Sequence, residues 1–300
     1  MKEINVYTQN LKKVFFLSII SFTCFLIGCN SETSAINRGH RWYDRGKFNN
    51  AVQTYSHALK INPSNPDAYY FRGLAKYKLQ DIEGAEADFS MAIKLNPTHI
   101  GAYINRGHLF NQRNEFDKAL SDCNKAIGLS PNEYRAYLVQ AEVWFYKRDF
   151  DKSIADCNFV LKNNPQMAVA YRDRADAFYW KLNYSEATRD YLKAVELDQK
   201  DSFALNNLAW ILATCEDEKI RDGKEALVFA RKAVDIDPSF ANLSTLAAAY
   251  AENRMFDEAV KIMKKIVSGE KDQKAQKEKY LKFFQSQKPI REKPVARGQI

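Results

Sequence analysis

Apolar residues recur along this chain at spacings of three and four, within stretches of about 14 residues that are separated by short polar turns. Spacing of this kind predicts an amphipathic α-helix with one apolar side. Arg45-Gly46-Lys47 and Gln80-Asp81 are examples of the turns. The pattern therefore predicts an all-α chain built from pairs of helices.

These pairs repeat every 34 residues, as small residues show at Gly39, Gly73, Gly107, Ala141, Ala175 and Ala209. Prolines recur at the same interval, at Pro63, Pro97, Pro131 and Pro165. The residue before a proline is pushed out of the α region, so each proline predicts the end of a second helix. The small residues predict close approach of the two helices of a pair. Because no pair buries its apolar side alone, neighbouring pairs are expected to stack into one continuous core.

The period and residue types resemble those of the tetratricopeptide repeat (TPR) family over residues 35–267. The resemblance implies a right-handed α-solenoid of about seven helix–turn–helix units. Two later units depart from the pattern: Gln199 stands in a proline position, and a polar loop at 215–223 adds five residues, with Ala226 where residue 221 is expected. Residues 268–285 are predicted to cap the solenoid, with a helix over 274–284.

In TPR proteins one stripe of the first helices lines a concave groove that holds partner peptides. The matching stripe here runs at offsets of four and three beside the packing positions. The residues that the resemblance assigns to peptide binding are Tyr43, Tyr70, Tyr77, His108, Phe145, Arg172, Asp176, Tyr179, Asn206 and Trp210. Aromatic anchors on a concave surface suit a protein or peptide partner. Packing of these rings within the core between repeats is the alternative interpretation.

Residues 1–28 have the features of a secretory signal. A basic start precedes residues 14–27, which are uncharged, mostly apolar and shorter than the ~20 residues of a membrane span. The stretch ends in Leu26-Ile27-Gly28-Cys29, which resembles the lipobox of bacterial lipoproteins. The resemblance implies cleavage after Gly28 and lipidation of Cys29, with residues 29–34 as a short linker. A plain signal peptide, or an uncleaved anchor with a chance cysteine, is the alternative.

A lipidated Cys29 would anchor the chain to a bacterial cell-envelope membrane, facing the periplasm or the exterior. The next residue is Asn30 and not the Asp associated with retention at the inner membrane in some bacteria. The outer membrane is therefore slightly favoured.

Catalytic motifs are absent from the sequence. There is no phosphate-binding glycine loop, no Gly-x-Ser-x-Gly and no His-Glu-x-x-His, and no Cys or His cluster has metal-ligand spacing. We expect no catalytic residue, metal or cofactor. Cys123 and Cys157 occupy equivalent repeat positions and are interpreted as core residues.

The formal net charge of +8 is unevenly distributed. Residues 1–28 contribute +2, residues 261–300 contribute +8, and residues 29–260 carry −2. The repeat body is thus nearly neutral, and nucleic acid is not an expected partner. Residues 286–300 are predicted to be a basic flexible tail, which either meets anionic lipid or an acidic partner or is simply solvated.

Two functional hypotheses follow. The first is a non-enzymatic, membrane-anchored scaffold that binds protein or peptide segments in its groove, with assembly of cell-envelope machinery as its narrower form. The second is a peptidoglycan- or polysaccharide-associated subunit that binds glycan or a glycan enzyme, because the aromatic groove could stack sugars.

Overall fold

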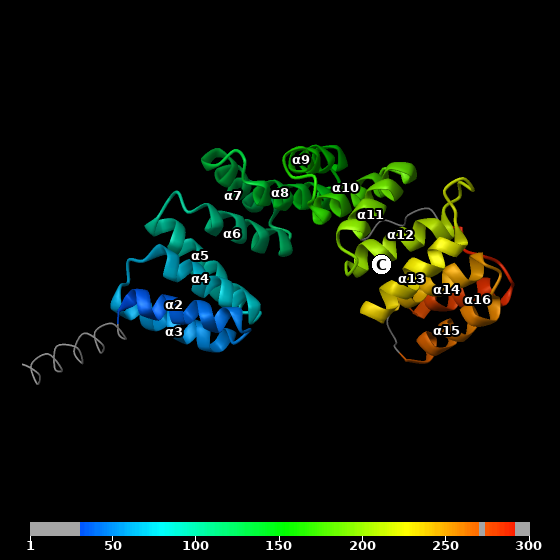
Figure 1. The fold of residues 1–300 in the computed structure, drawn as a ribbon, viewed down its shortest axis with the longest axis horizontal. Coiled ribbons are helices and arrows are strands. Elements are labelled where there is room, and N and C mark those ends of the chain that lie inside the picture. Colours follow the sequence, from blue (N-terminus) through cyan, green and yellow to red (C-terminus); the bar gives the residue numbers. More distant parts are fainter. Residues whose placement is uncertain (1–30, 270–273, 292–300) are drawn as a thin grey trace, which may run out of the picture. The chain divides into compact units, whose positions relative to one another are not determined.

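The structure, a computed structural model, describes residues 31–269 and 274–291. The predicted signal at 1–28, the predicted lipidation site at Cys29 and the part of the predicted tail beyond residue 291 lie outside the described residues. Within the described residues there are fifteen helices and no strand (Figure 1). The predicted all-α architecture of helix pairs is confirmed. The chain forms two compact units, one ending at Glu133 and the other starting at Tyr134.

The first unit contains three helix pairs, which we number as repeats one to three. Their helices are α2 (Glu32–Asp44), α3 (Phe48–Ile61), α4 (Pro66–Lys78), α5 (Ile82–Leu95), α6 (Ile100–Gln112) and α7 (Phe116–Leu129). The two helices of each pair pack against each other, and α3 and α5 each also pack against the first helix of the following pair.

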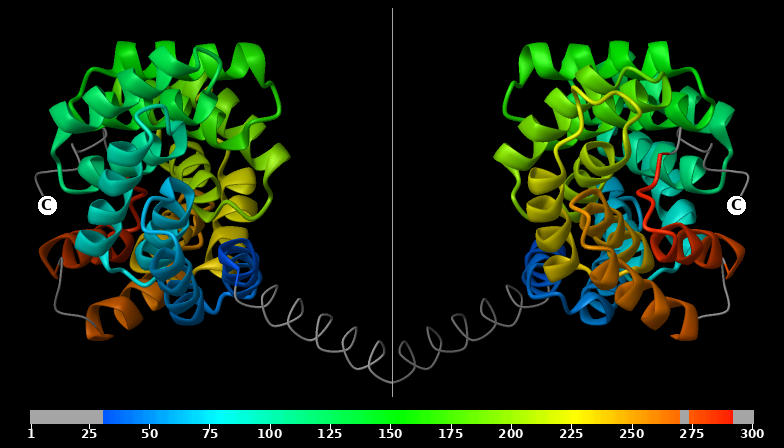
Figure 2. Two further views of the ribbon diagram at one scale, coloured as in Figure 1. Left: turned by 90° about the vertical axis from the view of Figure 1, so that its left-hand side faces the viewer. Right: turned by 90° about the vertical axis from the view of Figure 1, so that its right-hand side faces the viewer.

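The second unit contains repeats four to seven and a final single helix (Figure 2). Its helices are α8 (Tyr134–Tyr146), α9 (Phe150–Asn163), α10 (Ala168–Trp180), α11 (Tyr184–Leu197), α12 (Ser202–Thr214), α13 (Gly223–Ile236), α14 (Phe240–Glu252), α15 (Phe256–Gly269) and α16 (Lys274–Gln285). The helix expected over 274–284 therefore corresponds to α16, which packs against α15.

The turn between the two helices of a repeat has a constant backbone conformation. In repeats one to five, one residue of the turn has a positive φ of 59–68°, at positions that follow the 34-residue period: Gly46, Gln80, Asn114, Arg148 and Leu182. A left-handed residue ends an α-helix and turns the chain back. Repeat six lacks this residue because the five-residue insertion replaces its turn.

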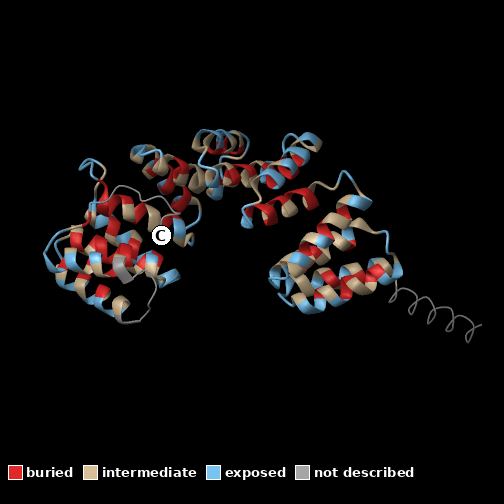
Figure 3. Cartoon of the chain, turned by 180° about the vertical axis from the view of Figure 1, so that it is seen from behind, coloured by how far each residue is buried: buried red, intermediate tan, exposed pale blue. Residues whose placement is uncertain are grey.

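The repeated small residues lie where a second-helix side chain crosses the first helix. In repeat one the Tyr55 ring lies directly over Gly39, and in repeat two the Phe89 ring lies over Gly73. Both rings are almost completely buried. Buried residues occupy the facing sides of the helices in each unit (Figure 3). Cys123, Cys157 and Cys215 are buried and are not in disulfide bonds.

The element boundaries differ from the predicted ones at both ends. Helix α2 begins at Glu32, inside the predicted linker, because the Ser31 side chain caps it by accepting a hydrogen bond from the Ser34 amide. At the other end, part of the predicted flexible tail is packed: Ile290 is only 1% exposed. Among the described helices, none has both the length and the apolar character needed to cross a membrane.

Candidate peptide-binding surface

A repeated ion pair ties the first helix of a repeat to the second. Arg72 donates to Asp88 from Nε at 2.8 Å and from Nη2 at 2.6 Å. The same bidentate pair forms between Arg106 and Asp122 in repeat three and between Arg174 and Asp190 in repeat five. The hydrogen bonds to these carboxylates raise the pKa of all three arginines. We call these pairs the Arg–Asp ladder.

Each arginine of the ladder also reaches the preceding repeat, where it donates to Ser56, Ser90 or Asn158. The ladder thus fixes the spacing of successive first helices, on which the groove stripe lies. Sequence reasoning missed it, although Arg recurs at 72, 106 and 174 and Asp at 88, 122, 156 and 190. This recurrence of Arg and Asp is the sequence pattern from which the ion pairs could have been predicted.

Repeat four breaks the ladder. Gln140 stands where the other three repeats have arginine, and its counterpart on the second helix is Asp156. Asp156 Oδ2 has no hydrogen-bond partner, and burial raises the pKa of this carboxyl to about 7. Repeat four therefore contains a carboxyl that is neutral in part at physiological pH.

In the first unit the predicted groove residues take part in three separate aromatic contacts. Tyr77 Oη lies 3.3 Å from His108 Nε2 and accepts a hydrogen bond from Gln112 at 2.8 Å. Tyr70 stacks at an angle on the His99 ring, with centroids 4.6 Å apart. Tyr43 packs edge-on against Phe48, and burial raises its pKa. All four predicted residues are half-buried, so they combine packing with an exposed part.

In the second unit the stripe carries a polar network. Arg172 donates to Asp173 at 2.9 Å and to Asp201 at 3.0 Å. Burial raises the pKa of Asp173 to about 7, against the opposing effect of Arg172. One turn further along α10, Asp176 accepts hydrogen bonds from Tyr191 Oη and, at 3.0 Å, from Asn207.

Asn206 extends this network on α12. Its Nδ2 donates to Asn207 Oδ1 at 3.4 Å, whereas its own buried Oδ1 has no protein partner. Phe203, on the first turn of the same helix, is the most exposed of the large apolar residues in the described chain, at 66%. The predicted stripe does not include Phe203, which is the second residue of α12. The predicted stripe positions begin only at the fifth residue of each first helix.

An aromatic pocket of about 90 Å³ lies beside the stripe at the ends of α8 and α10. Its walls are formed by Phe145, Tyr146, Arg148, Phe150 and Trp180. The pocket can take one side chain rather than a folded surface. The Tyr179 ring stands edge-on to the Trp180 ring of this pocket.

Trp210 has a different environment from the other stripe residues. Its ring lies 6.1 Å from the Tyr280 ring of α16, so the chain's own last helix lies against this part of the stripe. Within the described residues, no group of His, Cys, Asp and Glu side chains could hold a metal ion.

Stacked helix pairs with a polar and aromatic stripe on the first helices define a helical-repeat scaffold. Family models identify the repeats: a TPR repeat model matches residues 39–80, and the tetratricopeptide repeat model matches residues 66–99 and 101–133. The chain thus contains tetratricopeptide repeats, as predicted. None of the curated proteins matches the sequence.

Solved TPR structures share the fold. A tetratricopeptide repeat protein from Parabacteroides merdae is 17% identical, with a TM-score of 0.59 over 85% of this chain and 98% of that chain. A thermophilic TPR protein from Thermus thermophilus is 21% identical, with a TM-score of 0.52 over 60% and 97% of the two chains. The Cut9–Hcn1 hetero-tetramer of the APC/C has a TM-score of 0.67 at 15% identity, over 78% of this chain and 45% of that one. At these identities the likeness establishes the TPR solenoid fold.

Proposed function

We propose that this chain is a non-enzymatic TPR scaffold that binds a protein or peptide segment on the first-helix stripe of its second unit. A lipid on Cys29 would hold it to a bacterial cell-envelope membrane, where it serves the assembly of envelope machinery. The lipobox residues support the anchor, and the solenoid fold supports the scaffold role.

The observation that carries the binding role is the combination found on α8, α10 and α12. A side-chain-sized aromatic pocket lies at the C-terminal ends of α8 and α10. A fixed polar network with the unpaired Asn206 Oδ1 joins α10 and α12, and the Phe203 ring is exposed on α12. Aromatic anchors next to prepositioned polar groups are the usual composition of a binding hot spot. The network is held in place by its own hydrogen bonds, so little side-chain freedom is lost when a segment binds.

Removal of two exposed rings tests this role. Tyr146 and Phe203 are 54% and 66% exposed, so their replacement by alanine should leave the fold intact. Leu192→Ala and Val228→Ala, on the second helices α11 and α13, are matched controls at exposed apolar positions. A partner that co-purifies with the intact chain should be lost, by at least tenfold, from Tyr146→Ala and Phe203→Ala and retained by the controls. Equal retention by all four variants would refute the groove assignment.

A glycan ligand is the second candidate, favoured by the exposed ring of Tyr146 beside Trp180, since sugar faces stack on such rings. Calorimetry with soluble peptidoglycan fragments separates the two candidates. A heat of binding that disappears in Tyr146→Ala would support glycan binding. The absence of any heat of binding with the unaltered chain would rule out the glycan hypothesis.

A further inference from the structure

The groove stripe becomes more buried towards the end of the second unit. Of the thirteen residues of α10, three are buried, whereas eight are buried in α12 and eight in α14. Allowing for the five-residue insertion, the stripe continues on α14 at Thr245, Ala249 and Glu252. Thr245 is 2% exposed and Ala249 is 0% exposed. The buried stripe positions of α14 require a second layer over the face that is open in the earlier repeats.

The chain's own C-terminal segment, residues 274–291, contributes to that layer. Lys277 Nζ lies 4.9 Å from the ring centroid of Phe240, the first residue of α14, and Tyr280 lies against Trp210 of α12. Tyr280, Phe284 and Ile290 belong to the same apolar core as Leu205 and Leu208. The segment therefore lies on the stripe side of the last two repeats.

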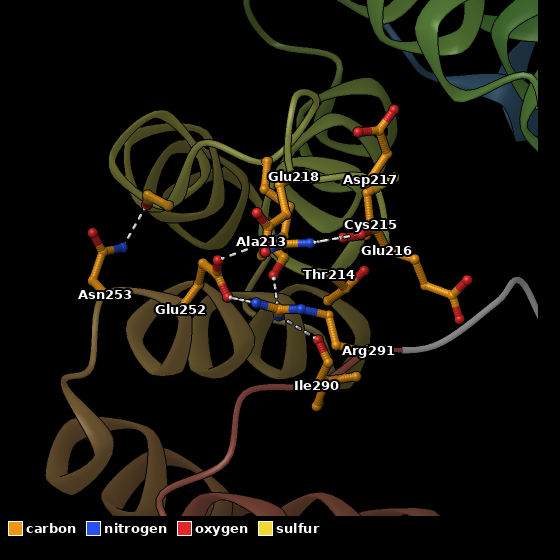
Figure 4. Close-up of polar contacts among 12 residues, drawn as sticks. Ala213, Thr214, Cys215, Glu216, Asp217, Glu218, Glu252, Asn253, Ile290 and Arg291 are labelled. Atoms are coloured by element: carbon orange, nitrogen blue, oxygen red, sulfur yellow. Dashed lines mark hydrogen bonds and ion pairs between the residues drawn. The ribbon is translucent and has the colours of Figure 1, made fainter.

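Arg291 fixes the other end of the segment. Its Nη2 lies 2.7 Å from Glu252 Oε2, and its Nη1 donates to the carbonyl oxygen of Ala213 at 3.4 Å (Figure 4). Glu252 also pairs with Arg221, 3.2 Å away, which in turn donates to the carbonyl oxygens of Cys215 and Glu216 in the inserted loop. Ala213 and Glu252 are both stripe positions, the last ones of their helices.

We propose that residues 274–291 are an internal pseudo-ligand, which occupies the groove of repeats six and seven and is displaced by a partner segment of similar chemistry. That chemistry is an aromatic residue for the Trp210 site together with a lysine or arginine for the Glu252 site. This inference rests on the proposed function, because it assigns the type of segment that the second unit recognises.

The charges of the stripe favour a cationic segment. Glu142, Asp176 and Glu252 lie on the stripe of the second unit, where Arg172 is already paired with two aspartates. Residues 274–291 hold six Lys or Arg against one Glu. Opposite charge on the two surfaces selects such a segment over an acidic one.

The segment is attached less firmly than a repeat. Three buried apolar side chains hold it: Tyr280, Phe284 and Ile290. In the ion pair between Arg291 and Glu252, the arginine side chain is 32% exposed. Ion pairs that are open to solvent contribute little to stability. Local opening of the segment should therefore precede unfolding of the helices beneath it.

The test uses a fluorescein-labelled synthetic peptide of residues 274–291 and the intact chain. The chain's own segment is present at high effective concentration and therefore competes with the labelled peptide for the groove. If the segment occupies the groove about 90% of the time, the apparent affinity of the chain for the peptide is about tenfold weaker than that of an open groove. The double variant Tyr280→Ala/Arg291→Glu should therefore bind the peptide at least tenfold more tightly than the unaltered chain, by fluorescence anisotropy. Adding Glu252→Arg should abolish that gain. Lys288→Ala, at an exposed position of the same segment, is the matched control and should change nothing.

Hydrogen exchange of the unaltered chain gives an independent readout that requires no variant. Amides of α16 should exchange much faster than those of α14. Either equal protection of α16 and α14, or no gain in peptide affinity for the double variant, would overturn the proposal. The Tyr146→Ala test reports on repeat four, outside the groove of repeats six and seven. Failure of the proposed function there is therefore distinguishable from failure of the pseudo-ligand here.

Discussion

Arg106 donates two hydrogen bonds of 2.8 Å to the carboxylate of Asp122, which is 5% exposed. Loss of one partner would leave the other buried without compensation, a situation that costs about 3 kcal/mol. We predict that Arg106→Gln lowers the free energy of unfolding by about that amount, as measured by urea titration followed by far-UV circular dichroism.

The double variant Arg106→Gln/Asp122→Asn separates pairing from packing. It removes both charges together, so it should be less destabilised than Arg106→Gln alone. A double variant that loses more stability than the single one would contradict the assigned role of the ladder.

The gap in the ladder gives a pH-dependent prediction. The pKa of Asp156 is raised in the folded chain to about 7, from an ordinary value of 3.8. The folded state then holds a proton that the unfolded state has lost, so this residue's contribution to stability falls as the pH rises from about 4 to about 7. Asp156→Asn should therefore stabilise the chain at pH 8, by roughly 1–2 kcal/mol after allowance for solvent screening, and have little effect at pH 4.

Gln140→Arg should act at the same place by restoring the pair. Its stabilisation relative to the parent chain should likewise increase between pH 4 and pH 8, as measured by urea unfolding at a series of pH values. Asp190→Asn, which breaks an existing pair, is the control and should destabilise at pH 8. A stabilisation by Asp156→Asn that is the same at all pH values would show that this carboxyl is not the titrating group.

Two glycines at the same repeat position should respond in opposite ways to alanine. A Cβ on Gly39 would lie 2.7 and 2.8 Å from Cδ1 and Cζ of Tyr55, a buried ring that has no room to move. A Cβ on Gly107 would lie 3.3 Å or more from every neighbour, with Ala119 O the closest atom.

Gly39→Ala is therefore expected to destabilise the chain by about 1–3 kcal/mol through overpacking. Gly107→Ala should be close to neutral, because the higher helix propensity of alanine offsets the tighter contact. Thermal unfolding of the two variants side by side measures the difference. The reverse order of stability would contradict the packing described for Tyr55.

The local architecture was predictable because it follows from short-range chemistry. The 34-residue spacing of Gly39, Gly73 and the prolines identified the helix pairs, and the 274–284 pattern identified α16. The Arg–Asp ladder was also visible in the sequence, at a spacing of 16 residues from each Arg to its Asp, but charged residues on amphipathic helices are usually solvated. Burial of those carboxylates depends on a guanidinium from the facing helix, which periodicity alone does not reveal.

The surroundings of Trp210 and Ile290 could not be predicted from repeat spacing. A ring on the groove stripe has the same sequence pattern whether it faces solvent, a partner or another part of its own chain. Only the path of residues 286–291 places Arg291 on Glu252, and a basic segment with two prolines is typical of a solvated tail.

The central claim is that the stripe of the second unit receives a partner segment. Photo-crosslinking in living cells, with the intact chain and a crosslinking amino acid at one position at a time, tests it most directly. Positions 146 and 203 lie on first helices next to the stripe, and positions 192 and 228 lie on second helices with comparable exposure. We predict one discrete crosslinked partner from 146 and 203 and none from 192 and 228. The same partner captured equally from all four positions, or from 192 and 228 alone, would contradict the claim.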